Sequence, residues 1–143
     1  NELRHPFSIV STNGTGHSLQ HAETGETIHP RCFGAFPRVL SRYVRERKIL
    51  SWEEAIHKMT GKPAAKAGIE KRGTIAVGNH ADIVVINPNE VEDHATSENP
   101  YRYPSGIPFV LVNGKMVVDE GEYTGNRFGT VLRRTGGFLE RFW

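Results

Sequence analysis

The sequence predicts an α+β protein, with helices in its first half and antiparallel strands in its second half. Two observations predict this class: helical periodicity of apolar residues over residues 36–60, and β-branched runs with turn signals over residues 71–118. The second half centres on residues 71–88, where glycines and Pro88 delimit a run of four β-branched residues at 83–86. Because that run has no polar alternation, we expect apolar surface to cover the strand on both faces.

The composition is that of one ordinary globular domain. The chain has 143 residues, of which 37% are hydrophobic, and a formal net charge of +2. Basic and acidic residues are mixed along the sequence, which argues against a nucleic-acid partner. No apolar run reaches the length of a membrane span and the start shows no secretory pattern, so no membrane partner is expected. The single cysteine, Cys32, fits a reducing compartment, and the cytoplasm is the predicted location.

The first thirty residues are predicted to form a short strand and a long loop. Residues 7–10 favour the strand, whereas residues 11–29 are rich in turn formers and poor in apolar side chains. Three histidines fall in this loop: His17, His21 and His29. The i, i+4 spacing of the first two is compatible with a zinc site that also uses the third and Cys32. The alternative is that these histidines are solvated.

Helices are predicted in the following segment. Residues 36–48 place apolar side chains at i, i+3, i+4, i+7 and i+8, which favours a helix with one buried face. Ser51 and Glu54 match a capping box, which predicts a helix over residues 52–60. A short third helix is predicted over residues 63–67, because proline is well suited to a helix start. We expect these helices to cover a sheet.

Two strands are predicted before a long connection. Residues 74–77 and 83–86 form the strands, and the polar, proline-containing residues 89–106 form a surface connection. The end of the chain is unusually apolar, which indicates either docking onto a surface or a patch for a partner. Its large apolar residues are Phe138, Leu139, Phe142 and Trp143.

A β-hairpin is predicted after the connection. Residues 109–112 and 115–118 are two β-branched runs that flank the pair Asn113-Gly114. Asn-Gly between two such runs is the strongest short-range signal of a hairpin, because both residues tolerate the positive φ of a type I′ turn. The sequence therefore predicts an antiparallel pair here.

The motifs of the chain, taken in order, resemble those of a known family. They are His-Pro-Arg at 29–31, Phe-Pro-Arg-Val-Leu at 36–40, Glu-Ala at 54–55, Lys-Met-Thr at 58–60, two glycine-delimited strand motifs at 73–85, Val-Asn-Gly at 112–114 and Thr-Gly at 124–125. As a series they resemble the C-terminal portion of the D-aminoacylase branch of the metal-dependent amidohydrolases, from residue 9 to residue 132.

The resemblance implies a fold and a cofactor. Family members are N-acyl-D-amino-acid deacylases, zinc enzymes with a (β/α)8 barrel and a small β-sandwich or barrel assembled from both chain ends. Residues 1–70 would then be the end of the barrel, with the last strand, a loop and flanking helices. Residues 71–143 would be the C-terminal part of the small β domain with its tail. Zinc is expected in the complete family enzyme, and no cofactor is expected for this chain alone.

The resemblance also implies three site residues and no metal ligand. The family has a catalytic aspartate followed by glycine just after the last barrel strand, and Asn13-Gly14 occupies that position. An amide has neither the charge nor the basicity of a carboxylate, so Asn13 should give little acid–base catalysis. Arg31 and His29 are the candidate substrate-binding residues, since a planar guanidinium suits the carboxylate of an N-acyl amino acid. The alternatives are a surface ion pair for Arg31 and a role of His29 in shaping the chain.

The sequence thus predicts the C-terminal part of a metal-dependent N-acyl-D-amino-acid deacylase. Because 143 residues cannot form a complete barrel, we expect no activity from the chain alone. Its expected partners are the N-terminal barrel portion of the same protein, a second copy of itself and, in the complete enzyme, the N-acyl amino acid. Asn1 at the start agrees with processing or excision from a longer chain. The alternative is a non-catalytic binding or assembly module derived from an amidohydrolase.

Overall fold

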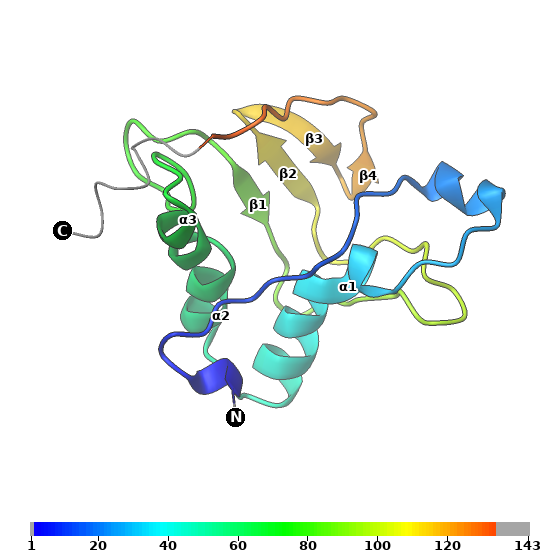
Figure 1. The fold of residues 1–143 in the computed structure, drawn as a ribbon, viewed down its shortest axis with the longest axis horizontal. Coiled ribbons are helices and arrows are strands. Elements are labelled where there is room, and N and C mark those ends of the chain that lie inside the picture. Colours follow the sequence, from blue (N-terminus) through cyan, green and yellow to red (C-terminus); the bar gives the residue numbers. More distant parts are fainter. Residues whose placement is uncertain (1, 134–143) are drawn as a thin grey trace.

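The computed structural model describes residues 2–133 and places helices beside an antiparallel sheet (Figure 1). In chain order the elements are η1 Glu2–Arg4, η2 Leu19–Thr24, α1 Arg31–Arg38, η3 Val39–Glu46, α2 Trp52–Met59, α3 Gly61–Ala67, β1 Ile83–Val85, β2 Phe109–Val112, β3 Lys115–Asp119 and β4 Glu122–Tyr123. The predicted mixture of helices, then antiparallel strands, is confirmed. The apolar tail at residues 138–143 lies outside the described residues.

One helix is longer and less regular than the sequence predicts. It begins at Arg31 in α1, five positions before the expected start, and continues without a break into η3, which is a π-helix. Pro37 lies inside α1. Because proline lacks an N–H and its ring crowds the carbonyl one turn earlier, the regular bonding pattern cannot continue there. A switch to wider π-type turns is one way to accommodate such a disruption.

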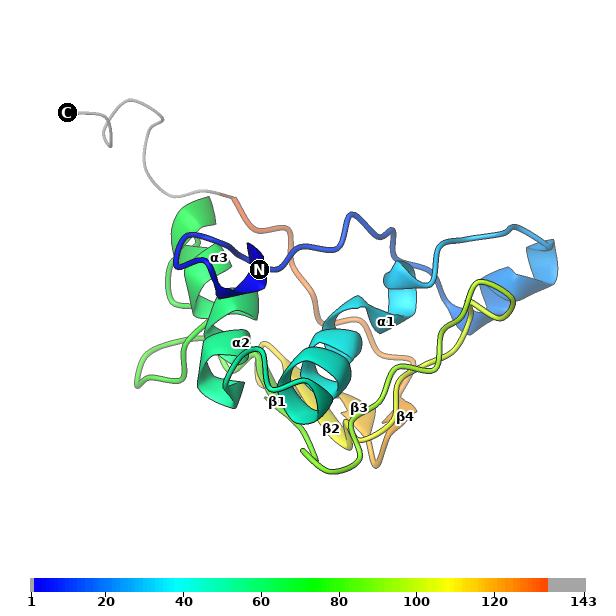
Figure 2. The same cartoon turned by 90° about the horizontal axis from the view of Figure 1, so that it is seen from below.

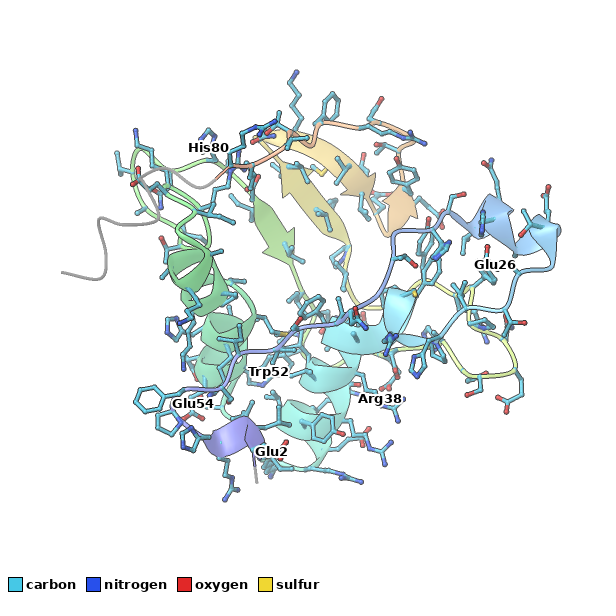
Figure 3. All side chains as sticks on the ribbon, in the orientation of Figure 1. Glu2, Glu26, Arg38, Trp52, Glu54 and His80 are labelled. Carbon is cyan, nitrogen blue, oxygen red and sulfur yellow. The ribbon has the colours of Figure 1, made fainter. Side chains whose placement is uncertain are left out.

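The hydrophobic core lies between this helix, α2 and the long connection. Its buried members are Val39, Leu40, Val44, Leu50, Ala55 and Val91. The predicted surface connection at 89–106 is therefore only partly on the surface, because Val91 has 0% exposure. Trp52, Ile86 and Ile107 pack against the same cluster and carry it toward the sheet. Figure 3 shows Trp52 between α2 and the helix formed by α1 and η3, whereas Glu26 lies at the far end of the projecting loop.

Arg45 fastens the long connection to η3. Its Nη1 donates to the carbonyl oxygens of Val91, at 2.6 Å, and of Asn89, at 3.3 Å. Its Nη2 forms an ion pair with Glu92. A guanidinium suits this position because its planar fork can satisfy several acceptors at once. Residues 89–92 are consequently held in place although they form no helix or strand.

The predicted strand at residues 7–10 is absent from the structure. These residues form a turn and an extended segment, in which the Val10 amide donates to the Lys58 carbonyl at 3.0 Å. Lys58 is buried, and its Nζ donates to the His5 carbonyl at 2.7 Å and the Ser8 hydroxyl at 2.9 Å. A strand requires a neighbouring strand for its backbone hydrogen bonds. Within the described residues this segment lies against α2 and has no such neighbour.

The capping box at the start of α2 is confirmed. The Ser51 hydroxyl accepts from the Glu54 amide at 3.1 Å, and the Glu54 carboxylate accepts from the Ser51 amide at 2.9 Å. The predicted short helix that follows is also present as α3, which starts at Gly61 rather than Pro63. Gly68 ends it in the left-handed conformation at φ 69°.

Ser51→Ala is expected to lower the free energy of unfolding by ~1 kcal/mol, because it removes the acceptor for an unpaired amide of the first turn. Urea unfolding monitored by circular dichroism would measure the change. Ser18→Ala is the matched control, since Ser18 precedes η2 with a similar extended backbone but makes no side-chain capping bond. Equal effects of the two substitutions would contradict the capping contribution.

The sheet has four antiparallel strands in the order β1-β2-β3-β4. The predicted hairpin is confirmed: Asn113 and Gly114 join β2 to β3 with φ values of 52° and 76°, as a type I′ turn requires. The Asp82 carboxylate accepts from the Asn113 amide at 2.8 Å and pairs with Arg72. Burial raises the pKa of Asp82, but the hydrogen bonds from Asn113 and Arg72 outweigh it and leave the pKa below its ordinary value of 3.8. β4 was not predicted.

Two expectations about the first strands are wrong for the described structure. Residues 74–77 form no strand, and Ile75 and Val77 are 89% and 107% exposed. β1 is present, but its apolar residues are not covered on both faces, since Val84 and Val85 are 52% and 43% exposed. Four strands and the helices of the described residues are too few to cover both faces of β1.

Among residues 2–133, no helix combines the length and the hydropathy that a bilayer crossing requires.

Candidate functional site

The segment around Asn13 crosses the start of α1. The Thr12 hydroxyl donates to the Arg31 carbonyl at 3.0 Å. Gly14 lies so close to α1 that a Cβ on it would be 3.1 Å from the Cα of Cys32. Asn13, between them, is exposed and has a φ of 40°, a left-handed conformation that asparagine tolerates better than most residues. Its neighbours in the chain thus rest against the same residues that begin α1.

His29 and Arg31 are connected through the backbone at the start of the helix. The Arg31 amide donates to Nδ1 of His29 at 3.0 Å, so this imidazole satisfies one of the amides that a helix leaves unpaired in its first turn. Nδ1 therefore acts as an acceptor. This contact supports the alternative role of His29, which is to shape the chain.

A cleft of about 450 Å³ opens between the start of α1 and the long connection. Its lining residues include His29, Arg31, Arg38, Asp93 and Glu98. Arg38 pairs with Asp93 at 3.3 Å across the cleft. The Arg31 side chain makes no hydrogen bond or ion pair with any residue of the described part, so its guanidinium is available to a bound anion. The surface ion pair considered for Arg31 is not found among these residues.

Gly34 allows the connection to approach α1 along this cleft. A Cβ at Gly34 would lie 3.0 Å from the Asp93 carboxylate oxygen, so a side chain would push the two walls apart. Asp93 itself is only 13% exposed at its side chain. The glycine and the aspartate together set the distance between the two walls of the cleft.

The predicted loop at residues 11–29 contains η2 and projects beside the long connection (Figures 1 and 2). The rings of His17 and His21 are tilted by 42° with centroids 4.8 Å apart, and both contact the Tyr101 ring, at centroid distances of 6.2 and 6.3 Å. The Tyr101 hydroxyl donates to the Glu26 carbonyl at 2.9 Å. The His21 ring bonds the Glu26 carboxylate at 2.6 Å, and this hydrogen bond lowers the pKa of Glu26. The projecting loop is therefore fixed to the connection by aromatic and polar contacts.

The described residues do not fit a metal site by themselves. Residues 2–133 contain no group of three or more histidine, cysteine, aspartate or glutamate side chains placed to hold an ion. The four residues of the zinc hypothesis are used differently: His17 bonds Thr15, His21 bonds Glu26, His29 accepts from the Arg31 amide, and Cys32 lies 3.9 Å from the Thr15 hydroxyl. Asn13 could offer only a neutral amide oxygen.

The structure adds residues that the sequence did not indicate. Asp93 and Glu98 enter the cleft from the long connection, and Phe33 and Tyr101 join the aromatic contacts beside it. Phe33 and Tyr101 have ring centroids 5.9 Å apart. The sequence contained one signal for these aromatic contacts, the i, i+4 spacing of His17 and His21. The two rings do lie together, but they contact the Tyr101 ring.

The comparison with protein families decides the assignment of the chain. The profile of the amidohydrolase family matches residues 21–118, which contain all of α1, the helices after it, β1, β2 and all but the last residue of β3. The chain belongs to the amidohydrolase family. The matched range includes both walls of the cleft.

Among the curated relatives are three D-aminoacylases or N-acyl-D-amino-acid deacylases, and at lower identity dihydroorotases and D-hydantoinases. The chain is 50% identical over 129 residues to the N-acyl-D-aspartate deacylase of Alcaligenes xylosoxydans xylosoxydans, covering 90% of the chain and 24% of that protein. It is 46% identical over 128 residues to the D-aminoacylase of the same organism, covering 90% of the chain and 25% of that protein. The chain thus spans about a quarter of the length of these relatives, and the resemblance to the D-aminoacylase branch is confirmed.

Solved structures agree with this assignment. A D-aminoacylase mutant in complex with copper chloride aligns with a TM-score of 0.74 and 45% identity, over 76% of this chain and 23% of that one. The N-acyl-D-glutamate deacylase of Bordetella bronchiseptica, solved with zinc and a phosphonate mimic of the tetrahedral intermediate, aligns with a TM-score of 0.61 and 46% identity. That alignment covers 62% of this chain and 19% of the deacylase. The amidohydrolase chain therefore has the fold of part of a D-aminoacylase.

Proposed function

We propose that the chain is the C-terminal part of a metal-dependent N-acyl-D-amino-acid deacylase, which hydrolyses the amide bond of its substrate. The observation that carries the proposal is the cleft at the start of α1, where Arg31 has an uncommitted guanidinium beside the Asn13 segment. An N-acyl amino acid carries a carboxylate by which a site can recognise it, and a guanidinium can bind a carboxylate through two hydrogen bonds. The names of the curated relatives support the same reaction.

In this proposal each site residue has one task. Arg31 binds the substrate carboxylate, and the positive end of the α1 dipole adds to the attraction because Arg31 is the first residue of that helix. His29 holds the Arg31 amide and so orients the first turn. Asn13 stands at the position of the family's catalytic aspartate and supplies no base there.

The division of the chain follows from the same proposal. Residues 1–70 would contribute the end of the barrel, with their helices, and residues 71–143 would contribute strands to the small β domain. All helices of the described residues precede residue 71 and all strands follow it, which supports this division. Zinc in the complete enzyme would need ligands from beyond residues 2–133, since these residues form no group of three or more ligands.

Arg31→Ala is expected to raise KM for an N-acyl-D-amino acid by about 10- to 100-fold, with a smaller effect on kcat. The size follows from losing a hydrogen-bonded charge pair, worth about 1.5–3 kcal/mol. Initial rates of amino-acid release should be measured on the protein at the full length that its source makes, supplied with zinc. Arg31→Lys should restore part of the affinity, because it keeps the charge but not the planar fork.

The control for this experiment is Arg102→Ala, which removes an exposed arginine that does not line the cleft. Its KM should match that of the unmodified protein. Equal KM values for the Arg31 and Arg102 variants would remove Arg31 from the substrate site. Absence of deacylase activity from both the full-length protein and its Asn13→Asp variant under all metal conditions would overturn the proposed reaction itself.

A second candidate is a non-catalytic assembly module, which the exposed apolar side chains of the β half favour. Ile75, Val77, Val84 and Val85 are all exposed in the described structure. Exposed large apolar side chains can mark an interaction site where they gather into a patch. Sedimentation velocity over a range of concentrations would distinguish the candidates: self-association without deacylase activity supports the module, and a concentration-independent monomer argues against it.

A further inference from the structure

The chain contains two Asn-Gly pairs in different environments. Asparagine followed by glycine is the pair best placed for deamidation, because glycine has no side chain to keep its amide nitrogen away from the asparagine carboxamide. One pair is Asn13-Gly14 at the start of α1, and the other is Asn113-Gly114 in the hairpin turn. Both are preceded by a β-branched residue, so their local sequences are similar.

The hairpin pair is restrained at every atom that the reaction uses. Nδ2 of Asn113 donates to the Phe128 carbonyl at 2.7 Å, and its Oδ1 accepts from Arg72 at 2.6 Å. The Gly114 amide, which would be the nucleophile, donates to the Ala81 carbonyl at 2.9 Å. Ring closure would therefore have to break three hydrogen bonds.

The pair at Asn13 has none of these restraints. Asn13 is exposed, and within residues 2–133 neither its carboxamide nor the Gly14 amide makes a hydrogen bond. The segment is positioned by Thr12, whose hydroxyl donates to Arg31, and that contact leaves the Asn13 side chain free to rotate. Within residues 2–133 no hydrogen bond has to break before the Gly14 nitrogen approaches the carboxamide carbon.

We infer that Asn13 is a site of spontaneous deamidation, through which the chain acquires a carboxylate at the start of α1. The Gly14 nitrogen attacks Cγ of Asn13, the C–N bond to the amide group breaks, and ammonia leaves with the proton from the Gly14 nitrogen. The product is a five-membered succinimide. Water then opens the succinimide. Attack at the side-chain carbonyl gives aspartate, and attack at the backbone carbonyl gives isoaspartate. The sum is amide plus water giving acid plus ammonia, with no oxidant or reductant.

The deamidation itself does not depend on the proposed function, but its effect on catalysis does. The position of Asn13 is that of the family's catalytic aspartate, so aspartate formed there is the residue that the position lacks. Gly14 packs tightly on Cys32, which disfavours the longer backbone of isoaspartate. Deamidation would then convert a chain without the base into one that has it.

The test follows both pairs in one sample of the protein at its natural length. Freshly purified protein is held at mildly alkaline pH, and tryptic peptides are resolved by mass and by isoaspartate content at intervals. We expect Asn13 to convert at least about tenfold faster than Asn113. In urea the two rates should converge, because unfolding frees Asn113 and Gly114 from their hydrogen bonds. Equal rates in the folded protein, or an intact Asn13, would overturn the inference.

Asn13→Gln is the matched variant, since it keeps a carboxamide at the same place but requires a larger ring. It should show no mass change at residue 13. Deacylase activity of fresh and aged protein is a separate readout. Conversion at Asn13 without a gain in activity would establish the modification and argue against a catalytic role of the position. No conversion, together with an active Asn13→Asp variant, would support the catalytic role and overturn the modification.

Discussion

Replacing Asn13 with aspartate is expected to raise kcat/KM for N-acyl-D-amino-acid hydrolysis by about 10²- to 10⁴-fold, the usual contribution of a positioned acid or base. A carboxylate can accept a proton from the attacking water, whereas the amide of Asn13 cannot. The substitution keeps the shape of the side chain at an exposed position, so the fold should tolerate it. Rates should be measured on freshly prepared protein at the full length that its source makes.

The control for this prediction is Asn126→Asp, the same chemical change at an exposed asparagine whose side chain makes no hydrogen bond in the described part of the chain. It should leave kcat/KM unchanged. Asn13→Ala should remain as slow as the unmodified protein, because both lack the carboxylate. If Asn13→Asp gains no more than Asn126→Asp, residue 13 does not hold the catalytic position.

Gly106→Ala is expected to lower the free energy of unfolding by about 2–6 kcal/mol, the sum of a left-handed conformation for a non-glycine residue and a steric collision. Gly106 has a φ of 70°, and a Cβ there would lie 2.3 Å from the Val91 nitrogen. Relief of that collision would displace Val91, which is fully buried in the core. Urea or thermal unfolding would measure the loss.

Gly25→Ala separates the two contributions to this effect. Gly25 has a similar φ of 73°, but a Cβ there would meet nothing within 4 Å. Its substitution should therefore show only the conformational part, about 1–3 kcal/mol. A Gly106→Ala variant no less stable than Gly25→Ala would show that the connection moves aside without disturbing the core.

The elements that could be predicted from sequence are those encoded by a few adjacent residues. Ser51 and Glu54 determine where α2 starts through two reciprocal hydrogen bonds, and Asn113-Gly114 determines the hairpin through its φ values. The start of α1 was missed because Gly34 and Pro37 interrupt the apolar pattern. Gly34 leaves room for the Asp93 side chain, and a local sequence pattern does not reveal such a contact between distant segments.

The strands that were predicted wrongly show that side-chain composition alone does not predict a strand. Residues 7–10 and 74–77 have the side chains that suit a strand, but composition does not show whether a neighbouring strand is present. The same applies to Val84 and Val85 of β1, whose predicted burial depends on surface that residues 2–133 do not supply. Asn13, His29 and Arg31 were found through the family resemblance, and the structure brings them to the start of α1.

The attachment of Arg45 to residues 89–92 has a consequence for how the connection can change in length. An insertion within residues 89–92 would break the hydrogen bond from Arg45 to the Val91 carbonyl and draw the Val91 side chain out of the core. Residues 96–99 are exposed and closed by a local turn, with the Thr96 amide donating to the Asn99 carbonyl at 3.1 Å. Exposed turns of this kind accept inserted residues. Since residues 96–98 also line the cleft, a change in the length of this turn would alter which molecules enter the cleft, while the anchored residues 89–92 stay in place.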